Sequence, residues 1–153
     1  MTDATSEQLQ ARIETIAHEW KECLGLSWWN VSFHYYRDSG VYAESGENLS
    51  PGSKAYTSAS WAYLDAAIHF NLSGLFDYND TQLEEVVVHE LTHILVHEMR
   101  SGTRCDCPYD IRHEERVCTT LQRAFVWTKE YFLRIAHENV APPPGEETAL
   151  DAG

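Results

Sequence analysis

The stretch of residues 81–99 constrains the fold of this chain most, because a continuous helical pattern there carries two closely spaced histidines. It contains neither proline nor glycine, and apolar residues flank the sequence HELTH at residues 89–93. Residues four apart lie on the same face of a helix. The pattern therefore predicts a half-buried helix on which His89 and His93 offer two imidazole nitrogens to one metal ion. Glu90, about 100° around the helix, would reach a water bound to that ion.

The start of this helix is also predicted from the sequence. Thr81 is followed three residues later by Glu84, and this spacing is that of a capping box, in which each side chain bonds to the backbone of the other residue. We therefore expect Thr81 to be the N-cap.

A catalytic zinc site needs a third protein ligand and one position open to water. His97 follows on the same stripe, but the helical rise places it about 12 Å from His89, too far to share one ion. Cys105 and Cys107 could bind a metal, but two histidines with two cysteines would close the site. Reduced loop thiols are the more ordinary interpretation of this pair.

The last helical segment, residues 110–138, offers a third region. Its apolar positions fall within about 100° of arc at 100° per residue. These positions are Val117, Leu121, Ala124, Phe125, Phe132 and Ile135. Glu114 projects into the middle of this arc and Glu115 about 100° outside it. Because a carboxylate on a buried stripe is costly unless it is paired or metal-bound, Glu114 is the predicted third ligand. His113, at the edge of the stripe, is the alternative.

The HELTH segment at residues 89–93, followed by Glu114 on a later helix, resembles the gluzincin type of zinc metallopeptidase. The compact layout is similar to SprT-like and minimal gluzincin domains and to small phage-encoded metallopeptidases. The resemblance covers roughly residues 28–132. It implies a small zincin-like domain, one zinc ion held by His89, His93 and Glu114, and Glu90 as the catalytic base in hydrolysis of a peptide bond. Many gluzincins carry an acidic residue four positions after the glutamate ligand, where this chain has Cys118.

The remaining pattern predicts an α+β domain over residues 1–140, followed by a disordered acidic tail over residues 141–153. We expect an N-terminal helix ended by Gly25, a long C-terminal helix, and a sheet of three or more strands with an antiparallel edge. This sheet is expected to lie over the helix of residues 81–99, called the metal helix below. The expected ranges are 5–24 for the first helix, 29–35, 54–61 and 62–72 for the strands, and 110–138 for the last helix. An extended peptide could add to an edge strand by main-chain hydrogen bonds, and the last strand before the metal helix is the expected edge.

The amino-acid composition limits the classes of partner that this chain is expected to bind. The chain has 24 acidic and 11 basic residues, a net charge of −13, which repels phosphate and argues against direct nucleic-acid binding. It has no membrane-length apolar run and no signal-peptide pattern, and its four cysteines do not make a disulfide framework. We therefore expect a cytoplasmic monomer, in the host cytoplasm if the chain is phage-encoded, that acts on a peptide or protein substrate.

Two other hypotheses share the same residues. A catalytically silent zinc-binding interaction module could retain a peptidase scaffold, although a purely structural site has no need of Glu90 as a base. Alternatively, Cys105 or Cys107 could occupy the open position of the metal and keep the enzyme inactive.

Overall fold

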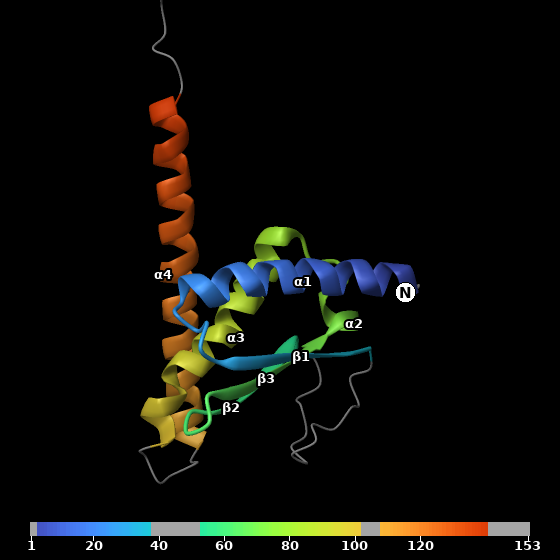
Figure 1. Ribbon diagram of the computed structural model, residues 1–153, viewed down its shortest axis with the longest axis vertical. Helices are drawn as coiled ribbons and strands as arrows, with labels where there is room; N and C mark the ends of the chain where they lie inside the picture. Colours follow the sequence, from blue (N-terminus) through green and yellow to red (C-terminus); the bar gives the residue numbers. More distant parts are fainter. Residues whose placement is uncertain (1–2, 38–52, 102–107, 141–153) are drawn as a thin grey trace, which may run out of the picture.

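The computed structural model describes residues 3–37, 53–101 and 108–140, which form an α+β fold as the sequence predicts. The expected loop over residues 38–53 and the expected tail over residues 141–153 lie, apart from Ser53, outside the described residues. In chain order the elements are α1 (Asp3–Cys23), β1 (Asn30–Tyr36), β2 (Ala55–Ser60), β3 (Asp65–Asn71), α2 (Leu72–Leu75), α3 (Asp80–Ser101) and α4 (Pro108–Val140) (Figure 1).

The strands form a mixed sheet in the order β1-β3-β2, in which β1 runs parallel and β2 antiparallel to β3. The antiparallel edge is therefore β2. The expectation that the last strand before the metal helix forms the edge is wrong, because β3 is hydrogen-bonded on both sides. Alternation along a strand tells which side chains are buried, but it does not tell which strands lie beside it.

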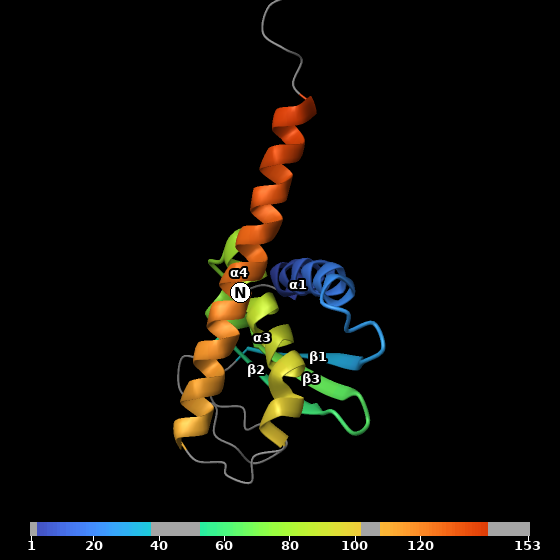
Figure 2. The same ribbon diagram turned by 90° about the vertical axis from the view of Figure 1, so that its left-hand side faces the viewer.

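The core lies between the sheet and the helices. β3 contributes Ile68 and Phe70, which are fully buried, and these residues belong to the same cluster as apolar side chains of α1 and α3. The buried residues of the two helices are Leu9, Ile13, Ala17 and Trp20 on α1 and Leu83, Val87, Val88, Leu91 and Ile94 on α3. Figure 2 shows α3 between the sheet and α4, so α3 is covered on two sides.

The N-terminus of α3 is capped two residues earlier than expected. The Asn79 side chain accepts a hydrogen bond from the backbone N–H of Gln82 at 2.9 Å, and the Gln82 side chain accepts one from the N–H of Asn79 at 3.0 Å. This reciprocal pair is a capping box, so the expectation of Thr81 as N-cap is wrong. Glu84, its expected partner, instead accepts hydrogen bonds from Trp20 and Lys129.

Gly25 ends α1 as the sequence predicts. The Leu26 N–H donates to the Lys21 carbonyl and the Gly25 N–H to the Glu22 carbonyl, at 2.9 and 3.0 Å. This is the Schellman arrangement, which needs a left-handed residue at the position of Gly25, and its φ is 72°.

Replacing Gly25 with alanine is expected to lower the free energy of unfolding by about 1 kcal/mol. A Cβ at this position would meet no atom within 4 Å, so the cost comes from the backbone conformation alone. Urea denaturation followed by circular dichroism measures it. An unchanged unfolding midpoint would contradict this account of the helix end.

The C-terminal helix α4 is much longer than the body that it contacts. Its first half packs against α3, where Cys118, Gln122 and Val126 are buried. Its second half extends away from the other described elements in both views (Figures 1 and 2). Among the described residues, no helix is both long and apolar enough to cross a membrane.

Candidate metal centre

Helix α3 presents His89 and His93 on one face, beside the start of α4. Their Nε2 atoms are 3.2 Å apart, and their rings lie edge to face at 80°. Both side chains are half-buried. Two imidazole nitrogens that converge at the rim of the core could bind one shared metal ion.

Glu115 of α4 lies beside both nitrogens. One carboxylate oxygen is 3.3 Å from the His89 Nε2 atom and the other is 3.4 Å from the His93 Nε2 atom. Zinc forms bonds of about 2.0–2.2 Å to nitrogen and oxygen in a tetrahedron, which sets neighbouring ligand atoms about 3.3 Å apart. His89, His93 and Glu115 therefore form a group that could hold a metal ion, and two imidazoles with one carboxylate fit a catalytic zinc site.

Glu114 lies on the other side of His93. Its Oε1 atom is 2.8 Å from the His93 Nδ1 atom, and its side chain is 12% exposed against 54% for Glu115. Glu114 does face the buried side of α4, as its place in the apolar arc indicates. Nevertheless, the structure brings Glu115, not Glu114, to the Nε2 atoms of both histidines.

The buried thiol of Cys118 completes the surroundings of His93. Its Sγ atom is 3.4 Å from the His93 Nδ1 atom, and Cys118 has no exposed surface. His93, Glu114 and Cys118 thus form a second group of donors that could hold a metal. This group is more buried than the first, and it does not include His89.

Glu114, Glu90 and Cys118 together raise the pKa of His93. Burial opposes a charged imidazole, but the hydrogen bonds to Cys118 and Glu114 and the charge of Glu90 outweigh it and raise the pKa of His93 to about 10. The pKa of Glu115 is lowered, mainly by its hydrogen bond to His89. In the metal-free protein, therefore, His93 is a positively charged imidazolium at neutral pH, and Glu115 is a negatively charged carboxylate.

The Glu90 carboxylate contacts the edge strand β2. Its Oε2 atom accepts a hydrogen bond of 2.6 Å from the Thr57 hydroxyl, and Glu90 is buried. Burial raises the pKa of this carboxyl above its ordinary range, although the bond from Thr57 and the charges of the two histidines oppose the rise. Thr57 thus connects the edge strand to the carboxylate that the sequence predicts as the base. Nothing in the local sequence distinguishes it from the neighbouring Ser58.

The other residues considered from the sequence lie elsewhere. His113 is exposed and contacts Arg116, and His97 belongs to neither group of candidate metal donors. Cys105 and Cys107 lie outside the described residues.

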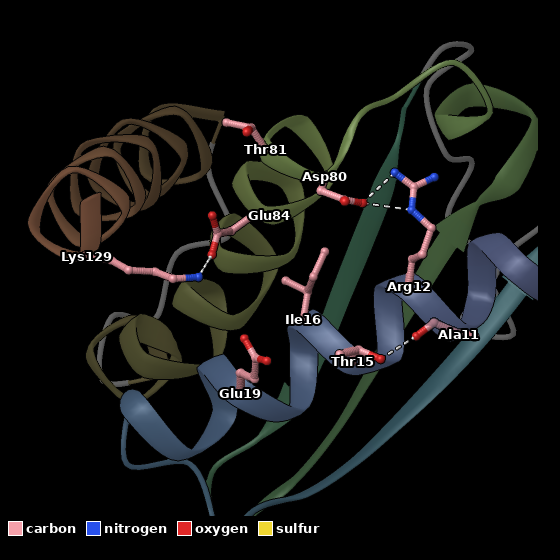
Figure 3. Close-up of a pocket in the computed structure, with 9 residues that line it drawn as sticks. All are labelled: Ala11, Arg12, Thr15, Ile16, Glu19, Asp80, Thr81, Glu84 and Lys129. Carbon is pink, nitrogen blue, oxygen red and sulfur yellow. Dashed lines mark hydrogen bonds and ion pairs between the residues drawn. The ribbon is translucent and has the colours of Figure 1, made fainter. Parts of the chain in front are cut away.

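A separate cleft of about 460 Å³ opens between α1, the start of α3 and α4. Four of its charged residues form two pairs, Arg12 with Asp80 and Lys129 with Glu84 (Figure 3). The lining residues are Ala11, Arg12, Thr15, Ile16, Glu19, Asp80, Thr81, Glu84 and Lys129. None of the candidate metal ligands lines this cleft, so the cleft and the metal centre are different places.

Comparison of the chain with family models, with curated proteins and with solved structures found no match.

Proposed function

We propose that this protein is a zinc-dependent peptidase in which His89, His93 and Glu115 hold one zinc ion and Glu90 is the general base. The convergence of both Nε2 atoms and the Glu115 carboxylate on one point carries this proposal. Bound there, zinc would lower the pKa of a coordinated water to about 7 and polarise the carbonyl of the scissile bond. The resemblance to gluzincins in the HELTH segment adds support.

Glu115 replaces Glu114 as the third ligand in this proposal, and Glu114 orients His93. Histidine ligands commonly donate the hydrogen of their second ring nitrogen to a carboxylate, which fixes the ring and strengthens it as a ligand. The Glu114 oxygen at 2.8 Å from Nδ1 fits this role. A carboxylate on Nδ1 also leaves Nε2 as the lone-pair nitrogen, on the side where His89 and Glu115 lie.

Glu90 would accept a proton from the attacking water and pass it to the leaving amine. A base acts best when its pKa is near the working pH, and burial raises the pKa of Glu90 in that direction. The proposed path for the substrate is the edge of β2 that pairs with no other described strand, since an extended peptide can add to an edge strand. Thr57 of that strand contacts Glu90, so a peptide bound there would lie near the base.

The direct test is cleavage of an unstructured protein, fluorescein-labelled casein, by the full chain with one equivalent of zinc. We expect cleavage that stops with 1,10-phenanthroline and returns when zinc is restored. A chain that binds one zinc but cleaves neither casein nor a broad peptide library would favour the silent binding module instead.

Zinc binding is expected to release at least about one proton at pH 7.5. The raised pKa of His93, about 10, means that the metal-free imidazole is protonated below that pH, and a metal displaces this proton. Affinity should therefore fall as pH is lowered from 10. Calorimetric titration in two buffers of different ionisation enthalpy measures the protons released.

The matched control for this titration is Glu114→Gln. It removes a hydrogen-bonding carboxylate that raises the pKa of His93, so less of the metal-free imidazole is positively charged and fewer protons should be released. Zinc binding without proton release in the wild-type protein would contradict the protonated state of His93.

A further inference from the structure

We propose that His93, Glu114 and Cys118 form a second metal site, which binds a thiophilic divalent cation and is distinct from the proposed zinc site. The proposal does not depend on the peptidase activity, because it concerns metal binding alone. The two sites share one residue, since His93 would use its Nδ1 atom here and its Nε2 atom in the zinc site.

Helix geometry brings the three donors together. Glu114 and Cys118 are four residues apart on α4, so they lie on one face of that helix. The Glu114 Oε1 atom is 2.8 Å and the Cys118 Sγ atom is 3.4 Å from the Nδ1 atom of His93 on α3. The three donor atoms all lie within 4.8 Å of one another. One ring nitrogen therefore has both a carboxylate and a thiol beside it.

These distances suit a common metal ligand shell. Around a tetrahedral zinc-sized ion, nitrogen lies about 3.3 Å from a neighbouring oxygen and about 3.6 Å from a neighbouring sulfur. The two distances from the His93 Nδ1 atom, 2.8 and 3.4 Å, are shorter than these values by about half an ångström or less. Small side-chain rotations would therefore be enough to admit an ion.

Burial distinguishes this group from the zinc site. Cys118 has no exposed surface, and the side chains of Glu114 and His93 are 12% and 14% exposed. Glu115, which belongs only to the zinc site, is 54% exposed. The zinc site is thus open to the water that its proposed chemistry needs, whereas the second group is largely enclosed.

The charges of the donors favour a divalent cation. The Glu114 carboxylate, a Cys118 thiolate and a neutral imidazole together carry two negative charges, which a divalent ion cancels. Such a neutral complex costs less to bury than a charged one. The thiol proton is released when the sulfur binds the ion.

The sulfur donor determines which divalent cation gains most from this group. A thiolate is a soft ligand and favours thiophilic ions. Zinc binds well to nitrogen and oxygen, so we expect its first equivalent in the open site with His89 and Glu115. A softer ion such as Cd²⁺ gains more from Cys118 and is expected in the second group.

The two ring nitrogens of His93 keep the two sites apart. With bonds of about 2 Å, ions bound to Nδ1 and Nε2 would be about 6 Å from each other. His89 and Glu115 lie beside the Nε2 atom, whereas Glu114 and Cys118 lie beside the Nδ1 atom. Substitution of His89 or Glu115 should therefore leave the second group intact.

Cadmium titration of the zinc-free full chain tests this proposal, because a cadmium–thiolate bond gives a charge-transfer band in the ultraviolet. The titration uses a chain in which Cys118 is the only thiol, with Cys23, Cys105 and Cys107 replaced by serine. We expect this chain to show the band and the further variant Cys118→Ser to lose it. Far-UV circular dichroism of each variant confirms that the helices are retained.

The two adjacent glutamates of α4 provide a matched pair of variants in the same background. Glu114→Gln should weaken the cadmium binding that produces the band by about 10-fold or more, whereas Glu115→Gln and His89→Ala should leave this binding unchanged. A Cys118-only chain without the band would overturn the proposal. A band that disappears in His89→Ala, or one that is insensitive to Glu114→Gln, would also overturn it, because the ion would then not be held by these three residues.

Discussion

Peptide hydrolysis is expected to fall by about 10²- to 10⁴-fold when Glu90 is replaced by glutamine, because a general base contributes a factor of that size. Glutamine keeps the shape of the side chain and can still accept the hydrogen bond from Thr57. Because Glu90 is not among the proposed ligands, zinc content should stay at the wild-type level. The measurement is the rate of casein cleavage at a fixed zinc occupancy, with the metal determined on the same sample.

The matched control is Thr57→Val, which removes the hydroxyl that bonds to Glu90 but leaves the carboxylate in place. It should lower the rate less than Glu90→Gln and shift the pH dependence upward, because the bond from Thr57 lowers the pKa of Glu90. A Glu90→Gln variant with the full cleavage rate would show that another group is the base.

Substitutions of the two adjacent glutamates of α4 are expected to lower zinc affinity by different amounts. Loss of an outer partner of a metal ligand typically costs about 10- to 100-fold in affinity, and this is the expected effect of Glu114→Gln. Glu115→Ala removes a ligand in the proposed site, so it should cost more than this and approach the effect of His93→Ala. Competition with a chromophoric zinc chelator measures all three constants.

The exposure of Glu115 allows its effect on zinc affinity to be separated from an effect on folding. The residue is half-exposed, so its loss should change the unfolding midpoint of the metal-free protein very little. Equal affinity for Glu115→Ala and wild type, with a large loss for Glu114→Gln, would return the third-ligand position to Glu114.

The α3 part of the candidate site could be predicted because it depends on local periodicity. A spacing of four residues puts His89 and His93 on one face of any helix, and the structure has their Nε2 atoms 3.2 Å apart. The positions of β1 and of most of β3 followed from alternation in the same way, whereas residues 61–64, expected within strands, form a turn. Both rules need only the neighbouring residues of the chain.

The partner on α4 could not be chosen from periodicity alone. The apolar arc indicates which side of α4 faces the protein, and Glu114 does lie on that side. The carboxylate that lies beside both Nε2 atoms, however, belongs to Glu115, which is outside that arc and half-exposed. Choosing between adjacent carboxylates requires the relative rotation of α3 and α4, which depends on tertiary packing.

The order of the strands was unpredictable for a related reason. Hydrogen bonds between β3 and both of its neighbours join segments far apart in the sequence, and the alternating pattern is the same for an edge and a central strand. The contact of Thr57 with Glu90 is a consequence of that order, because β2 lies beside α3. The N-cap of α3 was missed because Asn79 and Thr81 are both good capping residues.

X-ray absorption spectroscopy at the zinc edge, on protein loaded with one equivalent of zinc, tests the central claim most directly. The proposed site predicts two imidazole nitrogens with additional oxygen, all at about 2.0–2.2 Å, and no sulfur. A sulfur scatterer at about 2.3 Å that disappears in Cys118→Ser would place the metal among His93, Glu114 and Cys118 instead. That result would contradict the site formed by His89, His93 and Glu115.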